Sequence, residues 1–152
     1  MKQSALIQGG TSGLGQALVD RALESGEFEQ IFVTARNQKR ITTEDSRVIP
    51  IELDLMSDTS INEASEKIAT HTEKLHLVVT TAGILKDESV GVTPEKKLAD
   101  LTRSKLEIVF SVNCFGPFLW YSALGHLIRH REALVVATLS ARVASVGDNR
   151  LG

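Results

Sequence analysis

One stretch near the start of the chain limits what the rest can fold into. A short apolar run, Ala5 to Ile7, ends abruptly at Gly9 and Gly10, and helical spacing of apolar residues begins at Leu14. This order predicts a strand, a tight turn and a helix N-terminus. Glycine allows positive φ and lets a ligand approach without meeting a Cβ, and a helix N-terminus presents free N–H groups. The stretch therefore predicts a phosphate-binding turn, with a ligand-free glycine turn as the alternative.

The spacing of the glycines narrows the kind of turn. Gly9, Gly13 and Gly15 form G-x-x-x-G-x-G, which differs from the common dinucleotide fingerprint G-x-G-x-x-G. No Lys-Ser/Thr pair follows the last glycine, so the turn is not the phosphate loop of nucleotide triphosphatases. Its place at the start of a βα unit is where an open α/β sheet binds a nucleotide.

The pattern downstream predicts one α/β domain over residues 1–152. Pro50 fits an edge strand, because proline cannot donate a ladder hydrogen bond. Thr93-Pro94-Glu95 predicts the cap and first turn of a short helix. Strands are expected at 4–8, 30–35, 47–53, 75–80 and 133–139, and longer helices at 13–25, at 57–73 and from 102 towards 130.

Composition excludes several classes of function. The net charge is −2 without a basic stripe, and aromatics make up 5%, which argues against nucleic-acid binding. The single cysteine, Cys114, excludes an internal disulfide and suits a reducing compartment. No apolar run approaches the ~18 residues of a membrane span. His126 and His130 are interpreted as a solvated helix face rather than metal ligands. We expect a cytoplasmic protein with no metal, nucleic-acid or membrane partner.

The end of the second predicted strand bears on the cofactor. In dinucleotide folds an acidic residue about 20 positions after the glycines bonds the ribose 2′-hydroxyl. This chain has Ala35-Arg36-Asn37 there, without a carboxylate. The planar fork of Arg36 suits a 2′-phosphate, and Thr11 and Ser12 offer hydroxyl donors. The sequence therefore favours NADP(H) over NAD(H), unless Arg36 is an ordinary exposed arginine.

Two motifs resemble those of the short-chain dehydrogenases/reductases. Residues 8–15, Q-G-G-T-S-G-L-G, resemble T-G-x-x-x-G-I/L-G with Gln8 in place of threonine, and residues 80–83, T-T-A-G, resemble N-N-A-G. The resemblance spans essentially the whole chain and implies a Rossmann-type doubly wound parallel sheet in the strand order 3-2-1-4-5. Asp54 corresponds to a residue that contacts adenine in the family, and its alternative role as a loop or capping aspartate is compatible. The cofactor-binding residues are expected to be Gly9, Thr11, Ser12, Gly13, Leu14, Gly15, Arg36, Asp54, Leu55, Ala82 and Gly83.

The same resemblance suggests catalytic residues. Residues 112–116 resemble the V-N-x-x-G segment whose asparagine helps hold a water in the proton relay, so Asn113 has that role or is a buried structural asparagine. Ser140 follows the last predicted strand and resembles the serine that polarises the substrate oxygen, with Ser145 as the competing candidate. Residues 140–143 and 148–152 also resemble the C-factor-type branch of the family.

The family's Tyr-x-x-x-Lys motif does not occur in these residues, since Tyr121, the single tyrosine, has Gly125 at the fifth position of the motif. We interpret the sequence as the amino-terminal portion of a reductase acting on a carbonyl/alcohol pair. The alternatives are a non-catalytic NADP(H)-binding or signalling module, or a truncated remnant. The sheet is then incomplete on its C-terminal side, with an unprotected last strand and exposed Phe and Leu on the Asn113 helix. The family resemblance also implies a homo-oligomer, either a dimer or a tetramer.

Overall fold

The computed structural model describes residues 3–141 and Gly147, and its centre is a five-stranded parallel sheet. The strand order β3-β2-β1-β4-β5 confirms the predicted Rossmann-type topology. The predicted strand positions are also confirmed, with ends shifted by one or two residues. The strands are β1 (Gln3–Gln8), β2 (Phe28–Ala35), β3 (Val48–Glu52), β4 (Leu77–Thr80) and β5 (Val135–Thr138).

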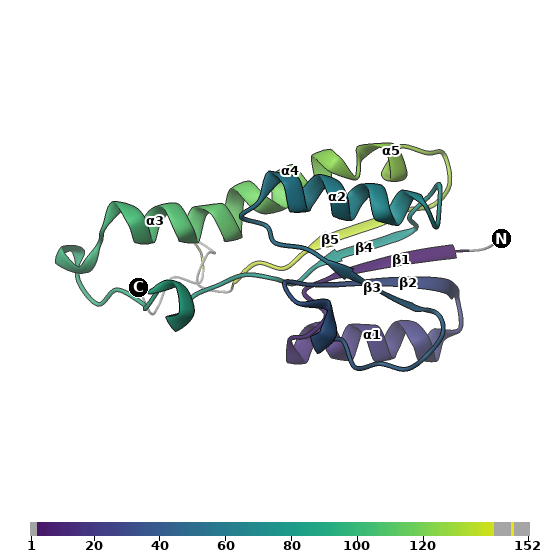
Figure 1. Cartoon of the computed structure of the whole chain (residues 1–152), viewed down its shortest axis with the longest axis horizontal. Coiled ribbons are helices and arrows are strands. Elements are labelled where there is room, and N and C mark those ends of the chain that lie inside the picture. Colours follow the sequence, from purple (N-terminus) through teal and green to yellow (C-terminus); the bar gives the residue numbers. More distant parts are fainter. Residues whose placement is uncertain (1–2, 142–146, 148–152) are drawn as a thin grey trace.

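Helices cover both faces of this sheet (Figure 1). Helix α1 (Gly13–Ser25) lies on one face, and α2 (Asp58–Ala69), α4 (Gly116–Ala123) and α5 (Gly125–Ile128) lie on the other. Helix α3 (Arg103–Phe110) extends beyond the sheet and continues through a π-helical segment, η4 (Ser111–Phe115), into α4. Within residues 3–141, the remaining helical turns are the 3₁₀ segments η1 (Gln38–Arg40), η2 (Glu88–Val90) and η3 (Leu98–Asp100).

The expected helix start at residues 93–95 is wrong. Asp87 and Val92 exchange two backbone hydrogen bonds of 2.9 Å as an antiparallel bridge. This bridge holds the chain in an extended conformation just before Thr93, and the next helical turn is η3, which begins at Leu98.

Each inner strand contributes to two cores, because successive side chains point to opposite faces of a sheet. On β1, Leu6 packs with Trp120 of α4 in one core, whereas Ile7 packs with Val19 of α1 in the other. All four of these side chains are buried. Burying a large apolar side chain is worth about 1.5–3 kcal/mol, so these contacts hold the start of α1 at the carboxyl ends of the strands.

The two edges of the sheet differ. β3 is an edge strand, as Pro50 predicted, and it pairs with β2. β5 is the opposite edge, and its Val135 and Val136 are exposed. Among residues 3–141, β5 has no strand partner besides β4, as expected for an unprotected last strand. Within residues 3–141, no helix combines the length and apolar character that a membrane crossing requires.

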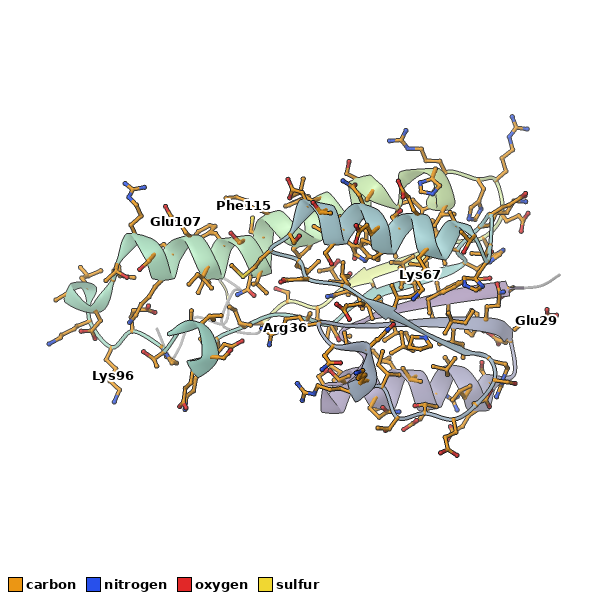
Figure 2. The ribbon with its side chains drawn as sticks, in the orientation of Figure 1. Glu29, Arg36, Lys67, Lys96, Glu107 and Phe115 are labelled. Atoms are coloured by element: carbon orange, nitrogen blue, oxygen red, sulfur yellow. The ribbon has the colours of Figure 1, made fainter. Side chains whose placement is uncertain are left out.

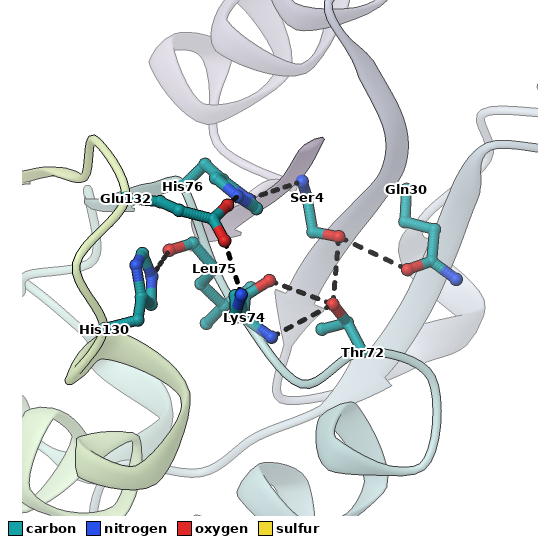
Figure 3. Close-up of polar contacts among 8 residues, drawn as sticks. All are labelled: Ser4, Gln30, Thr72, Lys74, Leu75, His76, His130 and Glu132. Carbon is teal, nitrogen blue, oxygen red and sulfur yellow. Dashed lines mark hydrogen bonds and ion pairs between the residues drawn. The ribbon is translucent and has the colours of Figure 1, made fainter. Parts of the chain in front are cut away.

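A polar network ties the amino ends of the strands together (Figure 3). The Nδ1 atom of His76 accepts the Ser4 backbone N–H at 3.1 Å, and Nε2 lies 3.0 Å from a carboxylate oxygen of Glu132. Lys74 also pairs with Glu132. His130 donates from Nε2 to the Leu75 carbonyl at 2.8 Å. The interpretation of His130 as part of a solvated helix face is wrong, because α5 ends at Ile128 and the ring packs half-buried beside His76.

Candidate functional site

A pocket of about 270 Å³ lies at the carboxyl ends of the strands. It is lined by the glycine turn after β1 and by the segments that follow β2, β3 and β4. Most of the predicted cofactor-binding residues line it, namely Gly9, Thr11, Ser12, Arg36, Asp54, Leu55, Ala82 and Gly83. The others, Gly13, Leu14 and Gly15, form the first turn of α1 directly behind the glycine turn.

Two glycines are required by contacts inside the turn. Gly9 has φ +89°, and a Cβ there would lie 2.7 Å from Thr81 Oγ1 and 2.9 Å from the Ala82 nitrogen. A Cβ on Gly15 would lie 2.2 Å from the Gly9 carbonyl oxygen. The turn can therefore pack against the segment after β4, and the start of α1 can pack against the turn, only when these positions lack a side chain.

The start of α1 fits a phosphate group. Ser12 caps the helix, since its Oγ accepts the Gly15 N–H at 3.1 Å and donates to the Gly9 carbonyl at 3.0 Å. The Ser12 hydroxyl is therefore already hydrogen-bonded within the turn. Of the two predicted hydroxyl donors, Thr11 is the one whose hydroxyl has no such hydrogen bond among the described residues. Among the described residues, the N–H groups of Gly13 and Leu14 have no acceptor. Such unsatisfied N–H groups at a helix N-terminus bind anions.

Arg36 follows β2 and forms an ion pair. Its guanidinium Nη1 lies 3.1 Å from Oδ2 of Asp87, which belongs to the loop after β4. The other carboxylate oxygen of Asp87 accepts from the backbone and hydroxyl of Ser89. The Ser89 hydroxyl, and after it Arg36, hold the pKa of Asp87 below its usual range. Figure 2 shows Arg36 and Glu29 at opposite ends of β2, which places Arg36 at the pocket end.

Sequence reasoning missed Asp87. The residue is 51 positions from Arg36, and no local motif marks it. The predicted strand order places the segments after β2 and β4 at one edge of the sheet. This order was the signal that could have suggested an acidic partner for Arg36.

Asp54 acts as a loop aspartate, and its expected contact with adenine stays a prediction. Its Oδ1 accepts the Met56 N–H at 2.9 Å, and its backbone N–H donates to Ser60 Oγ at 2.9 Å. The aspartate therefore shapes the loop after β3, and it also lines the pocket next to Leu55.

Thr80 and Thr81 stand at the positions of the two asparagines in the motif N-N-A-G. The Thr81 hydroxyl donates to the Gln8 carbonyl at 2.8 Å, and the Gln8 side-chain Oε1 accepts the Ala82 N–H at 3.3 Å. The Thr80 hydroxyl lies 2.7 Å from the Tyr121 hydroxyl, which in turn lies 2.6 Å from that of Thr138. Neighbouring strands β1, β4 and β5 are thus joined at the pocket end by other side chains.

Asn113 fixes the segment after β4. Its Oδ1 accepts the Ile84 N–H and its Nδ2 donates to the Ile84 carbonyl, both at 2.7 Å. It sits in the π-helical segment, where the Gly116 N–H reaches back to the Ser111 carbonyl. The alternative of a buried asparagine is wrong, because Asn113 is exposed and both polar atoms of its amide bind backbone. A π-helical turn of this kind often lies at a functional site.

Ser140 lies at the same edge of the sheet but outside the pocket lining. The Leu139 N–H donates to the Thr80 carbonyl at 3.0 Å, which brings the segment after β5 alongside the end of β4. Within the described residues, the exposed Ser140 side chain makes no hydrogen bond. Ser145 and the segments 142–143 and 148–152, which carry most of the resemblance to the C-factor-type branch, lie outside the described residues.

The parallel sheet and the glycine turn define a Rossmann-type α/β domain, and the pocket lies at the strand ends, where folds of this class bind nucleotides. The family model described as short chain dehydrogenase matches residues 3–147. The chain therefore belongs to the short-chain dehydrogenase family.

Two relatives agree with this assignment, and a solved structure shares the fold. The chain is 29% identical over 148 residues to an uncharacterised oxidoreductase of Schizosaccharomyces pombe, covering 93% of this chain and 55% of the relative. It is 26% identical over 151 residues to the 3-oxoacyl-[acyl-carrier-protein] reductase FabG of Aquifex aeolicus, covering 95% and 57%. The NADPH-bound carbonyl reductase from chicken fatty liver superposes with a TM-score of 0.84 at 18% identity, covering 99% of this chain and 61% of that one. The chain thus spans about half the length of the curated relatives.

Proposed function

We propose that this chain binds NADP(H) in the pocket at the carboxyl ends of its strands. The observation that carries the proposal is the meeting of three features in one place. These are the free N–H groups at the start of α1, the cation of Arg36 after β2, and the small residues Ala82 and Gly83 after β4. Together they provide for a pyrophosphate, a 2′-phosphate and a ribose that lies close to backbone.

Each residue then has a separate task. The Gly13 and Leu14 N–H groups bind the pyrophosphate, and Thr11 contributes its hydroxyl. Arg36 binds the 2′-phosphate through charge-assisted hydrogen bonds, and Asp54 accepts from the adenine amino group. The NADPH bound to the carbonyl reductase that shares this fold supports this choice of cofactor.

Arg36→Ala tests the cofactor assignment. A lost charge-assisted hydrogen bond is worth about 1.5–3 kcal/mol, so we expect NADPH affinity to fall by roughly 10- to 100-fold while NADH affinity changes little. Fluorescence titration of both cofactors measures this. Arg21→Ala is the matched control, because Arg21 is an exposed arginine of α1 that pairs with Glu24 away from the pocket. Unchanged NADPH affinity in Arg36→Ala would show the assignment to be wrong.

We further propose that the whole protein is a reductase acting on a carbonyl/alcohol pair. The nicotinamide supplies or accepts the hydride. Ser140 holds the substrate oxygen, and Asn113 positions the segment at Ile84 beside the site. The carbonyl reductase and the acyl-carrier-protein reductase among the similar proteins support a carbonyl substrate. Oxidation of NADPH with a panel of aldehydes and ketones tests this proposal.

A second candidate is NADP(H) binding without turnover. The observation that favours it is the setting of Tyr121, whose hydroxyl is held between Thr80 and Thr138 as a structural link. This tyrosine is therefore poorly placed to act as a general acid. The candidate predicts tight NADPH binding with no oxidation across the same panel, whereas turnover with any member would exclude it.

A further inference from the structure

We propose that Asp87 is a specificity-determining residue that reduces the preference of this chain for NADP(H) by competing with the 2′-phosphate for Arg36. The inference rests on the proposed function, because it concerns the adenosine end of the same pocket. The proposed function gives a role to Arg36 only. The inference adds that the carboxylate of Asp87, in the loop after β4, has its own effect on cofactor choice.

The ion pair is part of the lining of the pocket. Arg36 and Asp87 both line it, from elements on different sides, and their charged atoms lie 3.1 Å apart. The side chain of Asp87 is 13% exposed, whereas that of Arg36 is 61% exposed. The carboxylate is therefore the fixed member of the pair, and the guanidinium is the member that is free to reorient.

Several contacts hold the Asp87 carboxylate in place. Its Oδ1 accepts from both the N–H and the hydroxyl of Ser89, so Oδ2 is the oxygen that faces Arg36. The backbone of Asp87 is bridged to Val92 by two hydrogen bonds of 2.9 Å. Asn113 binds Ile84, three residues before Asp87, through two hydrogen bonds of 2.7 Å. The loop cannot withdraw the carboxylate without breaking this set of contacts.

The charges predict the direction of the effect. A 2′-phosphate that reaches Arg36 must displace or share a guanidinium already paired with Asp87, and it is then repelled by the nearby carboxylate. A ribose 2′-hydroxyl meets no such repulsion, and a carboxylate oxygen is an acceptor for its proton. In dinucleotide folds an acid at the end of the second strand has this acceptor role. In this chain Arg36 occupies that position, and the acidic residue, Asp87, belongs to the loop after β4.

Asp87→Asn separates the charge from the shape. Asparagine keeps the oxygen that accepts from Ser89, so the loop is expected to remain folded. We expect NADPH to bind about three- to tenfold more tightly and NADH to bind with unchanged or slightly weaker affinity. Glu88→Gln is the matched control, because it removes the same charge from the neighbouring residue, which pairs with Lys86 and does not line the pocket. The control is expected to change both affinities by less than about twofold.

Titration of NADPH and NADH against the wild type and the two variants decides the matter, with the melting temperature of each variant confirming that it is folded. A rise in the NADPH-to-NADH affinity ratio confined to Asp87→Asn supports the proposal. A ratio equal to that of Glu88→Gln, or a loss of NADPH affinity in Asp87→Asn, overturns it. If no variant binds either dinucleotide, the proposed function fails as well, whereas binding with an unchanged ratio removes the role of Asp87 alone.

Discussion

The glycines of the turn after β1 differ in what they do, although the motif treats them alike. Gly9 is surrounded by atoms of Thr81 and Ala82 after β4, and Gly15 by atoms of the turn itself, whereas a Cβ on Gly13 would meet nothing within 4 Å. Gly9 and Gly15 therefore serve the packing of the domain, and Gly13 leaves an open approach to the start of α1. Stability and binding can be separated at these positions.

Gly15→Ala is expected to destabilise the fold by about 1–3 kcal/mol, because backbone atoms of Gly9 and Gly10 must move to admit the Cβ. Gly13→Ala, two residues away in the same helical turn, is the control. Its Cβ enters open space, so its free energy of unfolding is expected to equal or slightly exceed that of the wild type. Urea unfolding monitored by circular dichroism measures both. Equal stability of the two variants would contradict this account of the turn.

At the scale of elements, the sequence correctly predicted the features that are determined by residues close together in the chain. The strands, α1 and the glycine turn were predicted because their periodicity and turn chemistry are local. The helix from residue 102 towards residue 130 was predicted, but its π-helical segment Ser111–Phe115 was not. No local pattern indicated the pairs Arg36–Asp87 and His76–Glu132, because 51 and 56 positions separate the partners and the folded sheet brings them together. Ser140 was placed at the correct edge, but its role stays a prediction.

The network at the amino ends of the strands makes stability depend on pH. Hydrogen bonds from Lys74, and then from His76, lower the pKa of Glu132 from 4.5 to about 2. Because the folded-state pKa lies below the unfolded value, the ionised Glu132 stabilises the fold above pH 4.5. This contribution is lost as the pH falls towards about 2.

Glu132→Gln is therefore expected to lower the melting temperature by a few degrees at neutral pH. The difference from the wild type should shrink as the pH falls from about 4.5 to about 2. Differential scanning calorimetry across this range measures it. Glu107→Gln on α3 is the control, since Glu107 forms no ion pair among the described residues, and its melting temperature should follow the wild type at every pH. A constant difference for Glu132→Gln would contradict the assigned charge state.

At the scale of the whole molecule, the two cores of the described residues leave a large apolar surface uncovered. This surface, the outer face of the α3–α4 segment, carries exposed Phe110, Phe115, Phe118 and Leu119. Phe115 points away from the sheet in Figure 2. The expectation that this helix exposes Phe and Leu is thus confirmed. Contiguous exposed apolar patches favour association, and pairing of the same face from two copies forms a closed dimer.

We expect the 152-residue chain to self-associate through this face, and Phe118→Ser to shift it towards the monomer. Phe118 is 73% exposed, so the substitution removes apolar contact area without opening a cavity in either core. Sedimentation velocity over a range of concentrations measures the association. Leu98→Ser is the control, because Leu98 is 86% exposed on η3, outside this face, and its loss should leave the association unchanged. If Phe118→Ser associates as strongly as the wild type, this face is not the contact between copies. The β5 edge, where Val135 and Val136 form a second uncovered surface, would then be the next candidate.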